Sequence, residues 1–173
     1  MLQPSPETYR SVLGLRTVRR FRPDPLSEED LTAILEAGRW TGSAKNHQPW
    51  MFLVIRDRGQ LERLSECGDF SQPLRAAAAA IVPIRTPVGY DWDLGRLSQN
   101  MMLAAAARGV GSCPITLHRE ECGREVLGVP DDHGCKFVVA LGYPDDEKES
   151  EGRAKSPLSG RKSLEELVRY ERF

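Results

Sequence analysis

The feature of this sequence that most restricts its fold is the unequal spacing of its short apolar runs. WMFLVI at 50–55, AAIVPI at 79–84 and CKFVVALGY at 135–143 are rich in β-branched or aromatic residues and predict buried strands. SCPITL at 112–117 predicts a further, irregular strand, and Pro83 suggests an edge or a bulge in the second run. Because helical segments of different lengths separate these runs, we expect an α+β fold and not a doubly wound sheet.

Amphipathic helices are expected between these strands. Residues 27–39 carry apolar side chains on one face, and Ser27 with Asp30 three residues later resembles a capping box at the helix start. Residues 91–108 form the predicted central helix, in which an apolar stripe lies beside alanines that permit close packing. Gly109 should end it. Shorter helices are expected at 6–14, 60–66 and 119–128.

Length and charge indicate the broad class of the protein. The 173 residues fit one domain, 1–173, and the formal net charge of −1 argues against nucleic acid or a membrane surface as the main partner. The N-terminal MLQPSPETYR lacks the features of a signal peptide, and the most apolar window, 76–84, is shorter than the ~20 residues that cross a bilayer. We therefore expect a soluble, cytoplasmic protein.

Several residue types that often carry chemistry lack the spacing of a known site. The four cysteines form no CxxC pair, so buried or incidental thiols are expected in preference to disulfides, a metal site or a redox site. The histidines, at 47, 118 and 133, lack metal-ligand spacing, and no metal is predicted. GVGS at 109–112 follows a helix and lacks the third glycine of a dinucleotide fingerprint.

Residues 144–163, PDDEKESEGRAKSPLSGRKS, are polar and aperiodic and predict a linker or disordered stretch. Leu164, Leu167 and Val168 follow and could bury an apolar patch. At about 3.3 Å per residue the stretch could reach roughly 60 Å. The tail, residues 144–173, is therefore long enough to embrace a second subunit.

A turn rich in arginine is the first candidate binding element. Arg16, Thr17 and Arg19 follow a predicted helix, where two guanidinium groups and a hydroxyl could converge on one phosphate. Arg161 and Lys162 could add a cation if the tail returns to this site. The alternative is a solvated basic surface.

A polar loop before the strand at 50–55 is the second candidate element. Asn46 and Gln48 alternate along SAKNHQPW, so in an extended loop both carboxamides would face one side and match the edge of a uracil-like ring. Ser43 lies beside them, and Pro49 restricts the loop. The alternative is that these amides only satisfy backbone groups. A ligand with a monophosphate, a polyol and a uracil-like ring is required, and FMN has all three.

These motifs resemble the FMN-dependent nitroreductase family. The resemblance runs through RTVRRFRPDPLSEEDLTAILEAGRWTGSAKNHQPWMFLVI, then DLGRLSQNMMLAAAARGVGSCPI, and then VVALGYP with its charged tail, and so covers nearly the whole chain. It implies a nitroreductase-like α+β sandwich with a mixed, mainly antiparallel sheet flanked by helices. It also implies an intertwined homodimer, with FMN at the interface and the C-terminal extension wrapped around the partner.

The resemblance also implies roles for individual residues. Arg16, Thr17, Arg19 and Arg161 would bind the phosphate of FMN, while Ser43, Asn46 and Gln48 would lie along the flavin. Pro114, Ile115 and Thr116 would come from the other subunit, with a backbone N–H near the reactive flavin atom N5, and Lys45 and His47 would face the substrate pocket. These assignments are expectations from matching positions.

The same resemblance implies a reaction. The family's FMN takes hydride from NADH or NADPH in a ping-pong cycle and reduces a small acceptor such as a nitroaromatic or a quinone. Two alternatives stay open: an FMN-dependent oxidase, dehydrogenase or dehalogenase of a specific metabolite, and a flavin-binding protein without turnover. Leu15 and Thr17 depart from the usual phosphate turn, Gly42 replaces a common proline, and a short segment at 67–91 predicts an open pocket.

Overall fold

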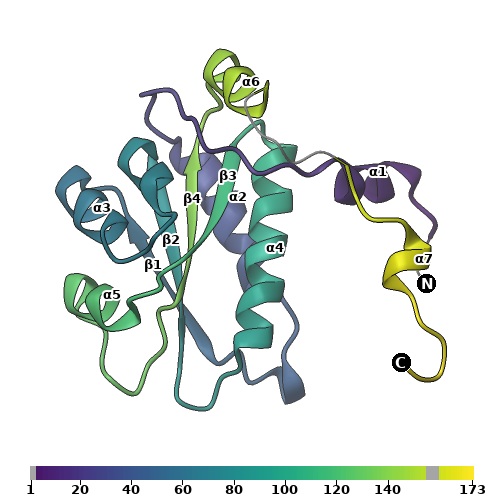
Figure 1. Cartoon of the computed structure of the whole chain (residues 1–173). Coiled ribbons are helices and arrows are strands. Elements are labelled where there is room, and N and C mark those ends of the chain that lie inside the picture. Colours follow the sequence, from purple (N-terminus) through teal and green to yellow (C-terminus); the bar gives the residue numbers. More distant parts are fainter. Residues whose placement is uncertain (1–2, 155–159) are drawn as a thin grey trace.

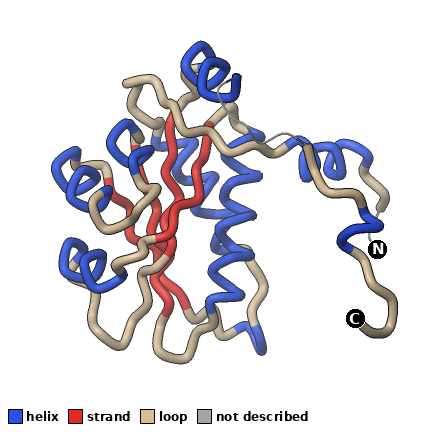
Figure 2. Tube along the Cα trace, viewed as in Figure 1, coloured by secondary structure: helices blue, strands red, loops and turns tan. Residues whose placement is uncertain are grey.

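A four-stranded antiparallel sheet between two layers of helices forms the centre of the computed structural model, which describes residues 3–154 and 160–173 (Figures 1 and 2). The strands are β1 (Trp50–Ile55), β2 (Ala79–Arg85), β3 (Gly111–Thr116) and β4 (Phe137–Gly142), in the order β1-β2-β4-β3. Every pairing is antiparallel within the described residues. The predicted α+β class is confirmed, and the strand expected to be irregular, β3, pairs with β4 along its full length.

Side chains alternate between two cores along the central strands, as the twofold period of a strand requires. In β2, Ala80 and Val82 face one core, whereas Ile81 faces the other. In β4, Val138 and Val139 divide in the same way. The central strands are therefore buried on both faces, which explains their continuous apolar sequences.

Helices α2 (Glu28–Arg39) and α4 (Asp91–Ala107) cover one face of the sheet (Figure 1). The Ser27 hydroxyl caps α2 by accepting a hydrogen bond from the backbone N–H of Asp30, at 3.0 Å. The buried stripe of α4 includes Leu97 and Met101, both 0% exposed, as its apolar spacing predicts. No helix in the described part of the chain has both the length and the apolar character needed to cross a membrane.

The opposite face carries α3 (Arg58–Ser65), the short 3-10 helix η2 (Gln72–Ala76) and α5 (Glu120–Leu127). Here the prediction of unpaired cysteines is wrong for two of the four. Cys67 follows α3 and forms a disulfide with Cys122 of α5, across a sequence separation of 55 residues. Cys113 and Cys135 are free and buried. Sequence spacing could not reveal the pair, because the packing of α3 beside α5 brings the two sulfur atoms together.

The suggestion of an edge or a bulge at Pro83 is also wrong, because β2 lies inside the sheet between β1 and β4 and pairs with β1 without an extra residue. Pro83 is opposite Phe52 of β1, but the pairing of β2 with β4 covers only Ala79, Ala80 and Ile81. The proline therefore lies outside the part of β2 that pairs with β4. Its missing N–H consequently removes no hydrogen bond between those two strands.

Part of the predicted linker is a helix. α6 (Asp146–Ala154) begins after Asp145, whose carboxylate accepts a hydrogen bond from the backbone N–H of Lys148 at 3.2 Å. Glu149, only 8% exposed, directs its carboxylate to the backbone N–H groups of Arg19 and Arg20. α6 is thus fixed by polar contacts, and its sequence has no apolar periodicity that would predict a helix. Residues 155–159 of the predicted linker lie outside the described residues.

Two short helices lie to one side of the sandwich in Figure 1. They are α1 (Pro6–Gly14), near the N-terminus, and α7 (Leu164–Leu167), near the C-terminus. Neither has a buried residue. The predicted apolar patch is present but uncovered within this chain: Leu164 is 77% and Leu167 is 62% exposed.

Asp30 joins the beginning of α2 to the ends of α4 and β4. Its carboxylate accepts hydrogen bonds from Ser27 and Tyr143, both at 2.8 Å, and from Arg108. These bonds, that of Ser27 first, lower the pKa of Asp30 below its ordinary value of 3.8. A lowered carboxyl pKa stabilises the fold above that value and loses this effect as the pH falls below it.

Replacing Asp30 by asparagine should therefore reduce stability at pH 7 and reduce the further loss on acidification. Urea unfolding at pH 7 and at pH 3 measures both effects. Glu62→Gln, which alters an exposed acid on α3, is the matched control and should change neither. Parallel pH profiles for Asp30→Asn and the unmodified protein would contradict this role of Asp30.

Candidate functional site

A pocket of about 500 Å³ lies between the edge strand β3, helix α4 and the chain just after α1. Thr17 and residues 114–116 of β3 line it together within one chain, whereas the family resemblance assigned 114–116 to the partner subunit. From α4 it is lined by residues that share one stripe of the helix: Gly95, Ser98, Gln99 and Met102. The volume falls within the roughly 300 to 1,000 Å³ that is typical of small-molecule sites.

One buried polar atom in this pocket lacks a partner. Ser98 Oγ is shielded from solvent and makes no hydrogen bond within the described residues. Such atoms are rare in folded proteins, because each costs about 1 to 3 kcal/mol of desolvation. The hydroxyl would have to turn into the pocket for a ligand there to supply the missing bond.

The predicted phosphate-binding arginines do not line this pocket. Arg16 is exposed, and its guanidinium Nη1 donates to the carbonyls of Leu13, at 2.7 Å, and Leu15, at 2.8 Å. Arg19 is also exposed, and its backbone N–H binds Glu149. Thr17 alone of the predicted phosphate-binding residues lines the pocket.

Arg161, the remaining predicted phosphate ligand, lies on the C-terminal arm just before α7. It is exposed and does not line the pocket of Thr17. The structure thus assembles part of the predicted phosphate site within one chain. The three guanidinium groups would have to be brought to Thr17 by movement of side chains or by a second copy.

The thiol of Cys113 lies behind the pocket on β3, facing the core away from α4. Burial, reinforced by Glu149 and opposed by Arg19, raises its pKa to about 11 from an ordinary 9.0. Burial likewise raises the pKa of Cys135 to about 11, with Glu120 adding to the effect. Both groups therefore remain thiols at neutral pH.

Alkylation of these two cysteines should be slow in the folded protein. At pH 8 a pKa near 11 leaves about 100-fold less thiolate than a pKa near 9, and the thiolate is the reactive form. Iodoacetamide labelling followed by mass spectrometry, with the urea-unfolded protein as control, measures the difference. Stability should also fall between about pH 9 and 11, because the unfolded chain releases these protons first. Equal labelling rates in the folded and unfolded states would contradict the expectation.

The loop 43–48 has an unusual backbone. The prediction of an extended loop is wrong, because Ala44–Asn46 forms a 3-10 turn. The backbone φ angles are positive at three positions, 50° at Lys45, 56° at Asn46 and 48° at Gln48. Residues other than glycine seldom adopt this region. Such strain is retained when surrounding contacts enforce it and is concentrated at functional sites.

Contacts within the loop and with α4 hold this shape. Ser43 Oγ accepts a hydrogen bond from the backbone N–H of Gln48 at 2.8 Å, and the Gln48 amide donates to Asn46 Oδ1 at 3.2 Å. Arg96 and Asn100 of α4 bind Gly42 and Thr41 just before the loop. The two carboxamides lie together, and the Gln48 amide also donates to the backbone carbonyl of Asn46 at 3.4 Å, so the alternative, that these amides satisfy backbone groups, holds for Gln48.

The loop and the pocket use different stripes of α4. Gly95, Ser98 and Gln99 line the pocket, whereas Arg96 and Asn100 hold the loop. Gln48 lines a separate hollow against α2 and β1, and Lys45 and His47 are exposed. One chain therefore presents two halves of the predicted site side by side on α4, without joining them around one cavity.

Comparison with known proteins identifies the family. The model of the nitroreductase family matches residues 12–84 and 72–143, which together form most of the chain. The protein belongs to the nitroreductase family. A relative from Archaeoglobus fulgidus, whose assigned name is NADH dehydrogenase/NAD(P)H nitroreductase, is 39% identical over 154 residues, covering 83% of this chain and 88% of the relative. An NADPH-flavin oxidoreductase of Vibrio harveyi is 25% identical over 166 residues, covering 84% and 69% of the two chains.

Solved structures of this family share the fold. A protein of Desulfovibrio desulfuricans assigned as a nitroreductase and crystallised with FMN has a TM-score of 0.80 and 26% identity, with 99% of each chain covered. An FMN-dependent nitroreductase of Clostridium difficile also has a TM-score of 0.80, with 25% identity over 95% of this chain and 99% of that one. The nitroreductase-like sandwich expected from the sequence is thereby confirmed.

Reasoning from the sequence missed the contribution of α4 to this nitroreductase pocket. Ser98, Gln99 and Met102 were read only as parts of a packing helix. Their spacing of three and four residues could have indicated a second, polar stripe beside the apolar one. Which stripe faces a pocket depends on the placement of α4 against β3, and the sequence pattern does not contain that information.

Proposed function

We propose that this member of the nitroreductase family is an FMN-dependent oxidoreductase that uses NAD(P)H to reduce a small organic acceptor, such as a nitroaromatic or a quinone. Family membership supports the reaction class, and the FMN complex of the Desulfovibrio protein supports the cofactor. The observation that carries the proposal is the pocket between β3 and α4, which is lined by Thr17, Ser98 and the segment 114–116.

The residues present fit FMN. When bound, FMN supplies the redox chemistry, accepting hydride from NAD(P)H and passing electrons to the second substrate in a ping-pong cycle. Thr17 would hold the phosphate, with Arg16 and Arg19 turning toward it from their exposed positions. Ser98 Oγ would gain a polar partner, and the segment 114–116 would form the wall against the ring.

A second copy of the chain would complete the site. Trp92 of α4 and Tyr90 just before it are 77% and 68% exposed, and the arms with α1 and α7 also leave apolar side chains uncovered. An apolar surface of this kind is typical of an interface. In a homodimer built on α4, the loop 43–48 of one copy could reach the pocket of the other, with the tail wrapped around its partner.

The loop 43–48 would then serve both cofactor and substrate. Asn46 and Gln48 would meet the flavin ring with their paired carboxamides, and Ser43 would maintain the loop. Lys45 and His47, exposed on the same turn, would face the acceptor. Their side chains are where we place the substrate preference of this protein.

The proposal is tested first by spectroscopy. The purified protein, incubated with FMN and then desalted, should retain flavin absorbance, and mass spectrometry should identify FMN after heat release. NADH or NADPH should bleach the bound flavin rapidly, and a nitroaromatic should restore its colour. A protein that stays colourless would refute the proposal. Slow bleaching would favour an oxidase, and bleaching without reoxidation a flavin-binding protein without turnover.

Steady-state kinetics test the shared pocket. Double-reciprocal plots at several acceptor concentrations should give parallel lines, because the oxidised nucleotide NAD(P)⁺ must leave before the acceptor enters. Intersecting lines would require both substrates bound together and would contradict a ping-pong cycle.

Replacing Ser98 by alanine should separate ligand binding from stability. Without ligand, the variant should be as stable as the unmodified protein or slightly more stable, because it loses a buried oxygen that has no partner. Its Kd for FMN should rise about 3- to 10-fold, matching the ~0.5 to 1.5 kcal/mol of one neutral hydrogen bond. Fluorescence titration with FMN and urea unfolding measure the two effects. An unchanged Kd would show that Ser98 does not face the cofactor.

A further inference from the structure

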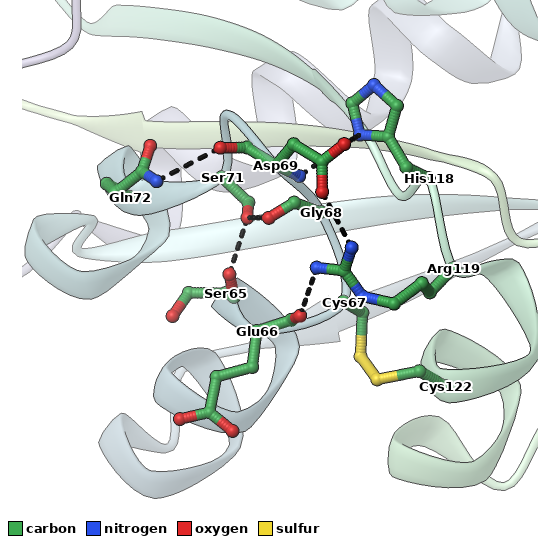
Figure 3. A network of polar contacts seen from close by, with 10 residues as sticks. All are labelled: Ser65, Glu66, Cys67, Gly68, Asp69, Ser71, Gln72, His118, Arg119 and Cys122. Atoms are coloured by element: carbon green, nitrogen blue, oxygen red, sulfur yellow. Dashed lines mark hydrogen bonds and ion pairs between the residues drawn. A yellow bond between two sulfur atoms is a disulfide. The ribbon is translucent and has the colours of Figure 1, made fainter.

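A strap of residues 66–72 joins α3 to η2 and lies against the chain that leaves β3 (Figure 3). The disulfide between Cys67 and Cys122 ties this strap to α5, with the two Cα atoms 5.5 Å apart. None of the residues proposed for cofactor or substrate binding belongs to the strap. The disulfide is therefore a redox-capable group that the proposed reaction does not use.

Polar contacts hold the strap independently of the sulfur atoms. The Arg119 guanidinium binds Asp69 Oδ1 at 2.6 Å and also donates to the carbonyl of Glu66. The backbone N–H of Asp69 donates to His118 Nδ1 at 3.1 Å, and that of Arg119 donates to the carbonyl of Cys67 at 3.0 Å. Figure 3 shows the contacts of Asp69 with Arg119 and His118 and that of Arg119 with Glu66. With the S–S bond broken, they would keep the two thiols close together.

The strap also touches the pocket wall. A Cβ placed on Gly68 would lie only 2.7 Å from the carbonyl oxygen of Thr116, so the strap backbone passes directly over that residue. Thr116 lines the pocket between β3 and α4. The covalent anchor at Cys67 is thus one residue from the point where the strap meets the pocket wall.

The two cysteines differ in burial. Cys67 is 0% exposed, whereas Cys122 on the outer helix α5 is only partly buried. An external thiol can therefore reach Cys122 more easily than Cys67. The other two cysteines, at 113 and 135, lie at 3% and 0% exposure and have no cysteine partner.

We propose that Cys67–Cys122 is a thiol–disulfide exchange site for small thiols, which controls how firmly the strap is held on the pocket wall. A thiolate RS⁻ attacks Cys122 Sγ, forming the mixed disulfide Cys122–S–SR, and Cys67 leaves as a thiolate that takes up a proton. A second RSH attacks the mixed disulfide, releasing RS–SR and the Cys122 thiol. In total the protein disulfide gains two electrons and two protons, and two RSH become RS–SR.

Reduction removes the covalent anchor and leaves the strap held by its polar contacts and by the packing of Cys67 in the core, so it opens locally more often. Amides of residues 66–72 should then exchange hydrogen about 10-fold faster, whereas those of β4 should not change. The consequence for the pocket rests on the proposed function: FMN should bind the reduced protein several-fold more weakly, because Thr116 loses part of its support.

Glutathione redox buffers test the exchange without any flavin. The folded protein is equilibrated at a series of reduced-to-oxidised glutathione ratios, quenched with acid, alkylated and analysed by mass spectrometry. Cys67 and Cys122 should become alkylated together, with the same midpoint ratio of reduced to oxidised glutathione. The variant Cys135→Ser should leave that midpoint ratio unchanged. Reduction that requires denaturant would identify a purely structural cross-link and overturn the proposal. A pair that oxidised glutathione cannot oxidise would overturn it as well.

Single variants test the order of attack. Cys67→Ser should form a mixed disulfide with glutathione at Cys122, whereas Cys122→Ser should leave the buried Cys67 unmodified. The opposite labelling would overturn the assigned route. Hydrogen exchange and FMN titration on the oxidised and reduced protein then test the effect on the strap and the pocket. FMN binding by neither form would reject the proposed function while leaving the exchange site intact, and equal exchange rates in the strap would reject the control of the pocket wall.

Discussion

Replacing Arg16 by alanine is expected to raise the Kd for FMN by about 10- to 100-fold, because one charge-assisted hydrogen bond to a phosphate contributes ~1.5 to 3 kcal/mol. Stability should hardly change. Arg16 is exposed, and among the described residues its guanidinium binds only the nearby carbonyls of Leu13 and Leu15. Flavin fluorescence quenching gives the Kd, and urea unfolding of the flavin-free protein gives the stability.

Arg10→Ala is the matched control for this experiment. Arg10 is also exposed and also donates to a nearby carbonyl, that of Pro6, but it lies inside α1, four residues before Gly14 ends that helix. Its removal should change the Kd for FMN by less than about 2-fold, because a distant exposed charge is screened by salt. Equal losses in the two variants would indicate a general effect of positive charge, and no loss in Arg16→Ala would remove Arg16 from the phosphate site.

Replacing Glu149 by alanine should lower the free energy of unfolding by about 2 to 4 kcal/mol, because two backbone N–H groups lose a charged acceptor. Its carboxylate accepts from the N–H of Arg19 and, at 2.6 Å, from that of Arg20. The side chain anchors α6 to the arginine turn, so the loss should also raise hydrogen exchange in residues 146–152. Glu151→Ala, an exposed acid on the same helix, is the control and should change stability little.

The variant Glu149→Gln separates charge from hydrogen bonding. Its amide oxygen can still accept, so stability should fall less than in Glu149→Ala. Glu149 is one cause of the raised pKa of Cys113, after burial, whereas Arg19 opposes it. Removing the negative charge should therefore lower the Cys113 pKa from about 11 and speed its alkylation at fixed pH. An unchanged alkylation rate would show that burial alone sets the reactivity of this thiol.

The candidate site was only partly predictable from local sequence. Within one chain Thr17 shares a pocket with the segment 114–116, and Asn46 contacts Gln48, while the binding roles of these residues stay predictions. The direction of Arg16 was not predictable, because a long exposed side chain takes whichever local acceptor it reaches. Ser98 was missed for a different reason. An unpaired buried hydroxyl is a property of the surrounding packing and leaves no trace in the residue pattern.

The sequence by itself determined the class of fold, the main elements and the family. These follow from signals between near neighbours: the apolar runs of β1 and β4, the Ser27 cap of α2 and the apolar stripe of α4. Such signals depend on residues only a few positions apart, so they can be recognised without the tertiary structure.

Only the tertiary structure decided how distant segments meet. The Cys67–Cys122 disulfide joins residues 55 positions apart, and α6 is held through Glu149, which lies 130 positions from Arg19. Neither pairing can be read from spacing, because each depends on which helices pack side by side. The physical reason is the same in both cases. A disulfide or a buried carboxylate stabilises the fold only when packing brings its partner within bonding distance, and that packing is a property of the whole chain.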